Sequence, residues 1–261
     1  DRYEYRFENY INSKFSITRN QQAGDYFIYN ADDPVTIQYF NNYKILSHPI
    51  SFSMKTTERQ GAFIKDEEML LKLKEEEVRM NINDFALKGK HNQYNTMAAG
   101  IASSIMDIRK EKIRDAVKSF EGLEHRMEKV ATIKGVDYIN DSKATNINST
   151  WFALENIEKP VVLILGGVDK GNDYSLIEEL VQDRVKGIIC LGLDNSKIVA
   201  AFAGKEKPFT EVQSMKEAVK EAYRMAEKGD VVLLSPACAS FDLFQNYEDR
   251  GRQFKNAVIE L

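Results

Sequence analysis

Three apolar runs in the second half of the chain constrain its fold more than any other feature. They are "VVLILGG" at 161–167, "GIICLG" at 187–192 and "DVVLLS" at 230–235. Strands of a parallel sheet are covered on both faces, so they are nearly continuous apolar runs rather than alternating ones. Amphipathic segments separate the three runs. This alternation of strands and helices predicts a doubly wound α/β domain.

The segments between the runs carry helix start signals. Ser175 is followed by Glu178, and Ser214 by Glu217, at the spacing of a capping box. After Ser214, apolar residues recur at helical spacing and predict a buried helix face. That face consists of Met215, Ala218, Val219, Ala222 and Met225. We therefore expect one α/β domain over residues 123–261.

Residues 1–122 show a different pattern. "DYFIYN" at 25–30 is typical of a strand, and "ADDP" at 31–34 of a turn. Residues 70–82 alternate apolar and polar around a charged turn, which favours a hairpin, with a helix as the alternative. From residue 91 the apolar spacing becomes helical. One helix face is predicted by Tyr94, Ala98, Ile101, Ile105 and Ile108, and a second by Ile113, Val117 and Phe120.

Composition excludes several classes of function. The 261 residues carry a net charge of −4 without a block of lysine and arginine, so we expect no nucleic-acid partner. No apolar run reaches the ~18 residues of a membrane span, and no signal peptide is recognisable. Apolar surroundings of Cys190 and Cys238 favour buried free thiols over a disulfide or reactive thiol, and hence a cytoplasmic protein. The opening "DRYEYRF" lacks a methionine, as a cut or processed piece would.

Charged and hydroxyl side chains gather in "INDSKATNINST" at 139–150, between a predicted strand and a predicted helix. Asp141, Lys143 and Thr145 therefore lie in a loop at the carboxyl edge of the sheet, where ligands of such folds bind. The start of a helix offers free N–H groups to an anion, and Lys143 adds a full positive charge. The alternative is that Asp141 or Thr145 only caps the helix.

Two further loops follow predicted strands. "LGGVDKGND" at 165–173 places Lys170 among glycines that allow close approach of a ligand, but it fits neither the P-loop pattern nor the dinucleotide fingerprint. "SPACASFDLFQNYEDRG" at 235–251 places small residues and Ser240 before a new helical segment. The carboxyl ends of parallel strands share one edge, so we expect these loops to converge on one site.

The first unit contributes a pair of amides. In "GKHNQYN" at 89–95, Asn92 and Asn95 are three residues apart at a helix start and face the same way. They can present paired amides to a nucleotide. The alternative is that Asn92 only caps the helix.

Together these segments carry a resemblance to a known family. The segments are "NADDP", "LKGKHNQYN", "GLEHRME", "INDSKATNINST", "LILGGVDKGND" and "LLSPACASFDLFQNYEDRG". On these, in order and over essentially its whole length, the chain resembles the Mur ligase family. The resemblance implies the second half of an α/β P-loop-type ATPase domain over residues 1–122. It implies a C-terminal Rossmann-like ligase domain over 123–261, and a missing N-terminal part of the same enzyme.

The resemblance also implies a reaction. The "DSKATN" and "SPACAS" blocks resemble those of the ligases in this family that add D-glutamate. ATP with Mg²⁺ would phosphorylate the L-alanine carboxylate of UDP-N-acetylmuramoyl-L-alanine, and the amine of D-glutamate would attack the acyl phosphate. Such a reaction gathers several negative charges, which positioned cations must offset.

Site residues carry over from the family position by position. The resemblance places Asn92, Asn95, Arg126 and Asp141 at the nucleotide, with Arg126 reaching its phosphates. It places Lys143, Thr145, Lys170, Ser240, Phe241 and Tyr247 at the D-glutamate end, with Lys143 and Lys170 as catalytic residues. Lys14 matches a lysine that the family carbamylates, and the carbamate would help to position Mg²⁺.

The chain departs from the family in three ways. No P-loop occurs in it, the family's metal-binding histidine before "DRY" has no counterpart, and Val168 stands where some members carry an acid, with Asp169 beside it. We therefore expect the isolated chain to fold, to be inactive and to leave Lys14 unmodified. Two alternatives remain: a related ligase for another amino acid, and a non-catalytic α/β binding module.

Overall fold

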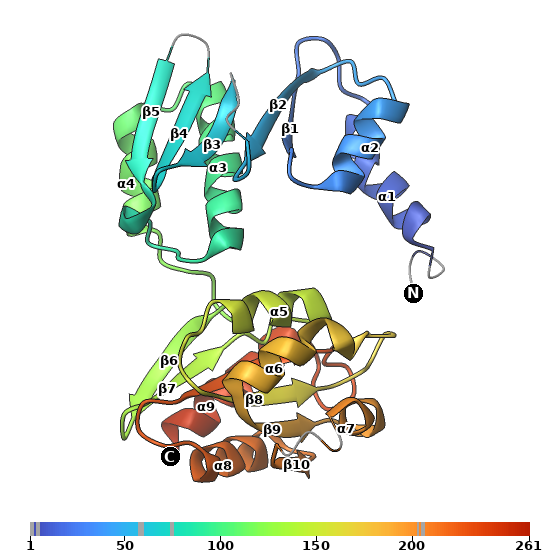
Figure 1. The fold of residues 1–261 in the computed structure, drawn as a ribbon, viewed down its shortest axis with the longest axis vertical. Helices are drawn as coiled ribbons and strands as arrows, with labels where there is room; N and C mark the ends of the chain where they lie inside the picture. Colours follow the sequence, from blue (N-terminus) through green and yellow to red (C-terminus); the bar gives the residue numbers. More distant parts are fainter. Residues whose placement is uncertain (1–2, 4–5, 57–59, 74–75, 203, 205–206) are drawn as a thin grey trace. The chain divides into compact units, whose positions relative to one another are not determined.

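The chain forms two compact units, Asp1–Glu121 and Gly122–Leu261. We describe a computed structural model, which covers residues 3, 6–56, 60–73, 76–202, 204 and 207–261. Figure 1 labels the helices and strands of both units. Each unit has its own sheet, with one hydrophobic core in the first unit and two in the second.

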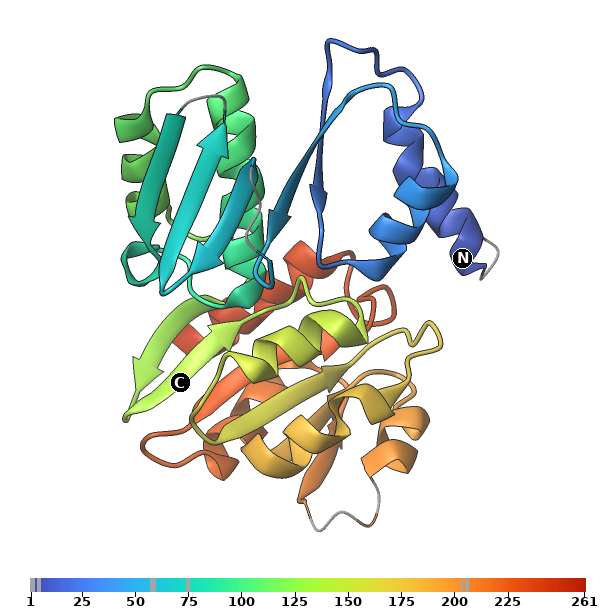
Figure 2. The same cartoon turned by 45° about the horizontal axis from the view of Figure 1, so that its top comes forward.

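The second unit contains a six-stranded sheet in the order β10-β9-β8-β11-β7-β6. Its strands are β6 (Glu128–Ile133), β7 (Val136–Asn140), β8 (Val161–Gly166), β9 (Val185–Leu191), β10 (Phe209–Val212) and β11 (Val231–Ala237). All neighbours pair in parallel except β6, which pairs with β7 as an antiparallel edge. Figure 2 shows this edge pair clearly. The three apolar runs thus form β8, β9 and β11, and the doubly wound α/β prediction is confirmed.

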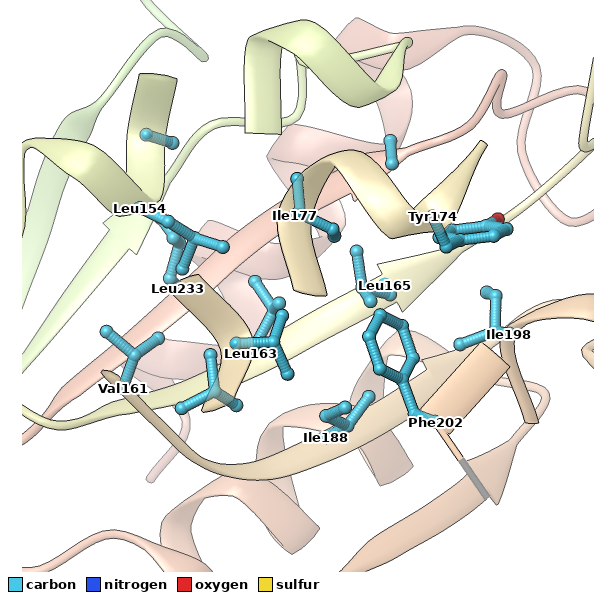
Figure 3. Packing of buried hydrophobic residues seen from close by; sticks show 14 of the residues in the cluster. Leu154, Val161, Leu163, Leu165, Tyr174, Ile177, Ile188, Ile198, Phe202 and Leu233 are labelled. Carbon is cyan, nitrogen blue, oxygen red and sulfur yellow. The ribbon is translucent and has the colours of Figure 1, made fainter. Parts of the chain in front are cut away.

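Helices cover both faces of this sheet. They are α5 (Ile147–Glu155), the 3-10 turn η3 (Tyr174–Ile177), α6 (Glu178–Arg184), α7 (Ser196–Phe202), α8 (Met215–Met225) and α9 (Tyr247–Ile259). One core lies beneath α5, η3, α6 and α7, and Figure 3 shows Leu154, Ile177 and Phe202 packed there against Leu163 and Leu165. The opposite face packs against α8 and α9. Successive side chains of each central strand therefore enter different cores, which explains their unbroken apolar sequences.

The first unit contains a five-stranded sheet in the order β1-β2-β3-β4-β5. Its strands are β1 (Tyr26–Asn30), β2 (His48–Ser53), β3 (Gly61–Lys65), β4 (Glu68–Leu73) and β5 (Glu76–Asn81). The first three are parallel, and β4 and β5 continue as antiparallel strands. The hairpin prediction for 70–82 is therefore confirmed, although its charged turn lies outside the described residues.

Helices of the first unit pack on this sheet and on one another. They are α1 (Phe7–Phe15), α2 (Pro34–Asn42), α3 (Lys90–Ile105) and α4 (Lys110–Ser119), with 3-10 turns η1 (Ser16–Thr18) and η2 (Ile82–Asp84). Met97 and Ile101 of α3 are fully buried against Met69 and Leu71 of β4. Asp33 caps α2, because its carboxylate accepts hydrogen bonds from the Val35 and Thr36 N–H groups.

Some local predictions were wrong. Ser175 does not cap α6: Asp173 instead caps η3, and α6 follows directly, with Ile177 at its N-cap and no side-chain cap. Ile108 and Phe120 lie beyond the ends of α3 and α4 and are exposed. The capping box at Ser214 is confirmed, since its hydroxyl accepts a hydrogen bond from Glu217 N–H and contacts the Glu217 carboxylate at 2.9 Å.

Two other predictions concern the whole chain. Both cysteines are free and buried. None of the described helices is long and apolar enough to cross a membrane.

The end of α5 depends on one arginine. Arg184 donates from Nη1 to the carbonyl oxygens of Leu154, Glu155 and Ile157 at 2.8–2.9 Å, and these are among the acceptors that a helix leaves unpaired at its end. We expect Arg184→Met to lower the free energy of unfolding by about 1–3 kcal/mol. The only tryptophan of the chain, Trp151, lies on α5, so its fluorescence in urea measures the loss.

Arg224→Met is the matched control, because Arg224 is exposed and its ion pair is with Glu221, one turn away. A pair of this kind contributes about 0.5 kcal/mol or less. Equal losses in the two variants would contradict the role assigned to Arg184.

Candidate functional site

The candidate site lies at the carboxyl edge of the sheet in the second unit. Its loops follow β7, β8 and β11, which are neighbours in the order β8-β11-β7. The chain leaves β8 toward the helices on one face and leaves β11 toward α9 on the other face. Such a change of direction between adjacent strands opens a crevice, where α/β folds bind their ligands.

A single buried arginine joins these three loops. Arg250 of α9 is 1% exposed. Its Nε donates to Ser142 Oγ at 3.0 Å, and Nη2 donates to Ser142 O at 2.9 Å. Nη1 and Nη2 each donate to Cys238 O at 3.1 Å, and Nη1 also reaches Gly166 O at 3.4 Å. One guanidinium therefore sets the spacing of the loops after β7, β8 and β11.

The loop after β8 requires its two glycines. Gly166 and Gly167 have φ values of +132° and +122°, which side chains of L-residues rarely adopt. A Cβ at Gly166 would lie 2.2 Å from Leu191 O, and one at Gly167 would lie 2.2 Å from Ala239 O. Because the backbones approach this closely, Val168 and Ala239 form an antiparallel bridge with hydrogen bonds of 2.8 and 3.2 Å. The bridge joins the loop of Lys170 to the loop of Ser240.

Asp141 is almost completely buried at the end of β7. Its Oδ2 accepts a hydrogen bond from Ser235 Oγ at 2.9 Å, and its Oδ1 accepts one from Met127 N–H at 3.3 Å. Burial raises the pKa of Asp141 to about 7, although these hydrogen bonds and the nearby charge of Arg126 act in the other direction. The α5 cap is Asn146, which accepts from Ser149 N–H. The capping alternative for Asp141 and Thr145 is therefore wrong.

Lys143, in the loop after β7, and Tyr247, the first residue of α9, come together. Lys143 Nζ lies 3.4 Å from the Tyr247 hydroxyl and 5.2 Å from the centre of its ring. Thr145 lies in the same tight loop, where its N–H donates to Lys143 O at 2.9 Å. These three predicted D-glutamate residues therefore form one group.

The remaining residues of that predicted set differ in exposure. Lys170 is exposed, and so is Phe241, at 70%. Ser240 is 2% exposed and lies next to Ala239, the partner of Val168. Lys170 and Phe241 are thus accessible to a ligand in the unbound protein, whereas Ser240 is nearly covered.

Arg126 is exposed beside a cluster of acids. Within the described part of the chain, Glu124, His125 and Glu128 are close enough to share a metal ion. Lys255 Nζ already pairs with both glutamates at 2.8 Å, and the His125 ring contacts Asn140 Nδ2 at 3.0 Å. The cluster is therefore an ion-pair network in which Lys255 already supplies the positive charge.

In the first unit, Asn92 and Asn95 lie on the first two turns of α3. Asn92 is buried, and its Nδ2 donates to Lys88 O at 2.8 Å, while Asn95 is exposed. The N-cap of α3 is Gly89, so the capping alternative for Asn92 is wrong.

Tyr94, between the two asparagines, is anchored to the sheet. Its hydroxyl donates to Asp32 Oδ2 at 2.8 Å, and Asp32 also accepts from Ser53 Oγ and Met54 N–H at 2.7 Å. Burial raises the pKa of Asp32, but these hydrogen bonds outweigh it and hold that pKa below its usual value. Burial and the Asp32 carboxylate raise the pKa of Tyr94 to about 12. Asp32 thereby ties the ends of β1 and β2 to α3.

Lys14 lies in the last turn of α1 and is exposed. Its Nζ is 5.3 Å from the centre of the Tyr10 ring. It lines a cavity of about 410 Å³ whose other walls include Asn30 and Asp33. Lys14, Asn92 and Asn95 belong to the first unit, and the other candidate residues belong to the second.

These features define a class of protein. The second unit is a doubly wound α/β domain that presents cationic side chains at the carboxyl edge, as domains that bind small anionic ligands do. Two family models match the chain: the Mur ligase middle domain over residues 1–103, and the Mur ligase, glutamate ligase domain over residues 125–238. The chain belongs to the Mur ligase family.

Curated relatives match along the whole chain. A UDP-N-acetylmuramoylalanine–D-glutamate ligase of Christiangramia forsetii is 52% identical over 261 residues. A ligase of the same name from Porphyromonas gingivalis is 51% identical over 270 residues. Both alignments include 100% of this chain and only 59% and 58% of the relatives.

Solved structures share the fold at low sequence identity. A pseudomurein peptide ligase type C from Methanothermus fervidus matches with a TM-score of 0.70 and 14% identity, over 99% of this chain and 60% of that one. MurF ligase from Thermotoga maritima in complex with ADP matches with a TM-score of 0.62 and 13% identity, over 97% and 58%. At these identities the likeness shows the fold alone.

Sequence reasoning missed Arg250 and Asp32 as organising residues. Both stand inside motifs that were recognised, "NYEDRG" and "NADDP". Their contacts reach residues more than 60 positions away in several cases, such as Ser142 for Arg250 and Tyr94 for Asp32. No local sequence pattern predicts contacts between residues this far apart in the chain.

Asp141 should make stability depend on pH. Burial raises its pKa from 3.8 to about 7, so the folded state favours the protonated carboxyl. The stability that this carboxyl contributes to the folded state is fully present below pH 4 and is lost as pH rises through 7. Asparagine preserves the shape without the charge. We expect Asp141→Asn to be more stable than the parent at pH 8, by about 2–4 kcal/mol, with the advantage disappearing near pH 4. Urea unfolding followed by Trp151 fluorescence at both pH values measures it.

Asp194→Asn is the control, because hydrogen bonds to Ser196 lower the pKa of Asp194. Asp194→Asn should be no more stable than the parent at pH 8. A stability difference for Asp141→Asn that is the same at pH 4 and pH 8 would contradict the burial argument.

Proposed function

We propose that this chain is the central and C-terminal part of a ligase that joins D-glutamate to UDP-N-acetylmuramoyl-L-alanine in peptidoglycan synthesis. The observation that carries the proposal is identity of about half along the whole chain to relatives that share this one name. The chain spans about 59% of the length of those relatives, so the activity belongs to the complete enzyme.

The chemistry at the D-glutamate end follows from charge. D-glutamate carries two carboxylates, and its amine must remain free to attack an activated carboxyl group. Lys143 and Lys170 supply two positive charges on loops that Arg250 ties to one edge. The hydroxyls of Thr145, Ser240 and Tyr247 supply hydrogen-bond donors, and exposed Phe241 supplies an apolar wall. Charge-assisted hydrogen bonds of this kind are the strong ones in proteins.

For the nucleotide, each unit offers its own groups. ATP supplies the phosphoryl group that activates the L-alanine carboxylate. In the first unit, exposed Asn95 would present its amide from α3, whereas Asn92 is buried and its Nδ2 already donates to Lys88 O. In the second unit, exposed Arg126 would offer its guanidinium to phosphates, and Asp141 its buried carboxyl to a ribose hydroxyl. The raised pKa of Asp141 fits this role. A carboxyl group whose pKa is close to neutral pH is protonated part of the time, and it can then donate a hydrogen bond as well as accept one.

Lys14 would act only after modification. Its ammonium carries the same sign of charge as Mg²⁺ and does not fit the ion, whereas a carbamate on Nζ would supply oxygen ligands. The cavity beside Lys14 contains Asn30 and Asp33, which are also oxygen donors. We propose that carbamylated Lys14 helps to hold Mg²⁺ at this site in the complete enzyme.

Lys170 provides the sharpest test of the acidic amino-acid site. In a complete ligase that carries these two domains, Lys170→Ala should raise the KM for D-glutamate by about 10- to 150-fold, as the loss of a charge-assisted contact costs roughly 1.5–3 kcal/mol. The KM for ATP should change by less than about twofold. A panel of amino acids in the same phosphate-release assay checks that D-glutamate is the preferred one.

Lys216→Ala serves as control, because Lys216 pairs with Glu260 on the exposed surface. An unchanged D-glutamate KM and kcat in Lys170→Ala would remove Lys170 from the site. Preference for another amino acid would instead support a related ligase.

The isolated 261-residue chain should not catalyse the ligase reaction. It contains no G-x-x-x-x-G-K-[ST] loop, and such loops hold the reacting phosphates in enzymes of this type. Positioned groups of that kind are worth about 10³–10⁵ in rate. The measurement is phosphate release from Mg-ATP with both substrates, in a preparation whose mass excludes longer enzyme. Release that depends on both substrates would contradict the expectation.

A further inference from the structure

The loop of Lys170 is anchored on both sides of that residue. On one side, Val168 pairs with Ala239 through two backbone hydrogen bonds. On the other side, Asn172 Nδ2 donates to Ala237 O at 2.9 Å and contacts Cys238 Sγ at 3.4 Å. The backbone of the loop is therefore fixed to the end of β11, while the Lys170 side chain is exposed.

Asp169 organises the loop from within. Its Oδ1 accepts hydrogen bonds from Gly171 N–H at 2.7 Å and Asn172 N–H at 3.2 Å. Its Oδ2 accepts one from the Tyr174 hydroxyl at 2.9 Å. The carboxylate thus closes a tight turn around Lys170.

Lys197 of α7 completes this arrangement. Its Nζ lies 2.9 Å from Asp169 Oδ1, and its own side chain is 61% exposed. Burial raises the pKa of Asp169, but Lys197 and the other hydrogen-bond donors outweigh it and hold that pKa below its usual value. Asp169 is therefore an anion directly beside Lys170 in sequence. Without Lys197, its charge would offset that of Lys170 and repel a carboxylate ligand.

We propose that Asp169 and Lys197 are positioning residues for Lys170. Asp169 shapes the turn that presents the Lys170 ammonium, and Lys197 neutralises Asp169 so that the Lys170 charge is available to the acidic amino acid. The inference rests on the proposed function, in which Lys170 binds D-glutamate. It adds two residues that act through Lys170 without touching the substrate.

The test uses a complete ligase that carries these domains. Lys197→Met should raise the KM for D-glutamate at least about fivefold, as small misplacements of a binding group have large effects, and should leave the KM for ATP unchanged. Lys197→Arg should restore the parent value, because it keeps the ion pair. In Lys170→Ala, the further change Lys197→Met should have no additional effect, because its action passes through Lys170.

Lys186→Met is the matched control. Lys186 Nζ also pairs with an aspartate at 2.9 Å, Asp230, but at the opposite end of the sheet, so the D-glutamate KM should stay at the parent value. An unchanged KM in Lys197→Met together with a raised KM in Lys170→Ala overturns this inference alone. An unchanged KM in both overturns the proposed site as well. Additive losses in the double variant overturn the positioning role, because Lys197 would then bind the substrate itself.

Discussion

The carboxyl edge of the second unit depends on the buried guanidinium of Arg250. Burying a charge is costly, and its hydrogen bonds here go to the neutral oxygens of Ser142, Gly166 and Cys238. Burial lowers the pKa of Arg250 only to about 10, so it remains charged at neutral pH. All the hydrogen bonds of this guanidinium can form together only when the three loops keep these positions. It therefore fixes the relative positions of the side chains that they carry.

This arrangement explains the polarity of the edge. Arg250 bonds to residues at the ends of β7, β8 and β11, and the candidate lysines lie in two of the segments that it holds. Lys143 follows Ser142, which bonds to Arg250, and the loop of Lys170 starts at Gly166, which does too. A buried cation beside exposed lysines adds positive potential at this edge. That charge supports the proposed binding of a small anion there, even though the chain carries a net charge of −4.

The sequence predicted those elements whose environment is uniform along their length. β8, β9 and β11 were recognised because nearly every residue is buried. β10 was not, because its residues are only partly covered and Phe209 is exposed. The Ser175 prediction failed because Asp173, two residues earlier, starts the helical turn, and its carboxylate accepts hydrogen bonds from both the N–H and the hydroxyl of Ser175. Propensity describes each residue separately, whereas the residue that caps a helix depends on where the chain enters it.

The site was predictable to the extent that topology alone brings residues together. Loops after parallel strands must share an edge, so Lys143, Lys170 and Ser240 were found from their place after a strand. Arg250 was not, since an arginine in an amphipathic helix normally faces solvent. Its signal lies in spacing: the buried residues of α9 are Arg250, Gly251, Phe254, Ala257 and Val258. Counting back four residues from Phe254 puts the arginine on the apolar stripe. A charged residue at a core position of a helix beside a ligand edge must find acceptors inside the protein, and loop carbonyl oxygens are the acceptors available there.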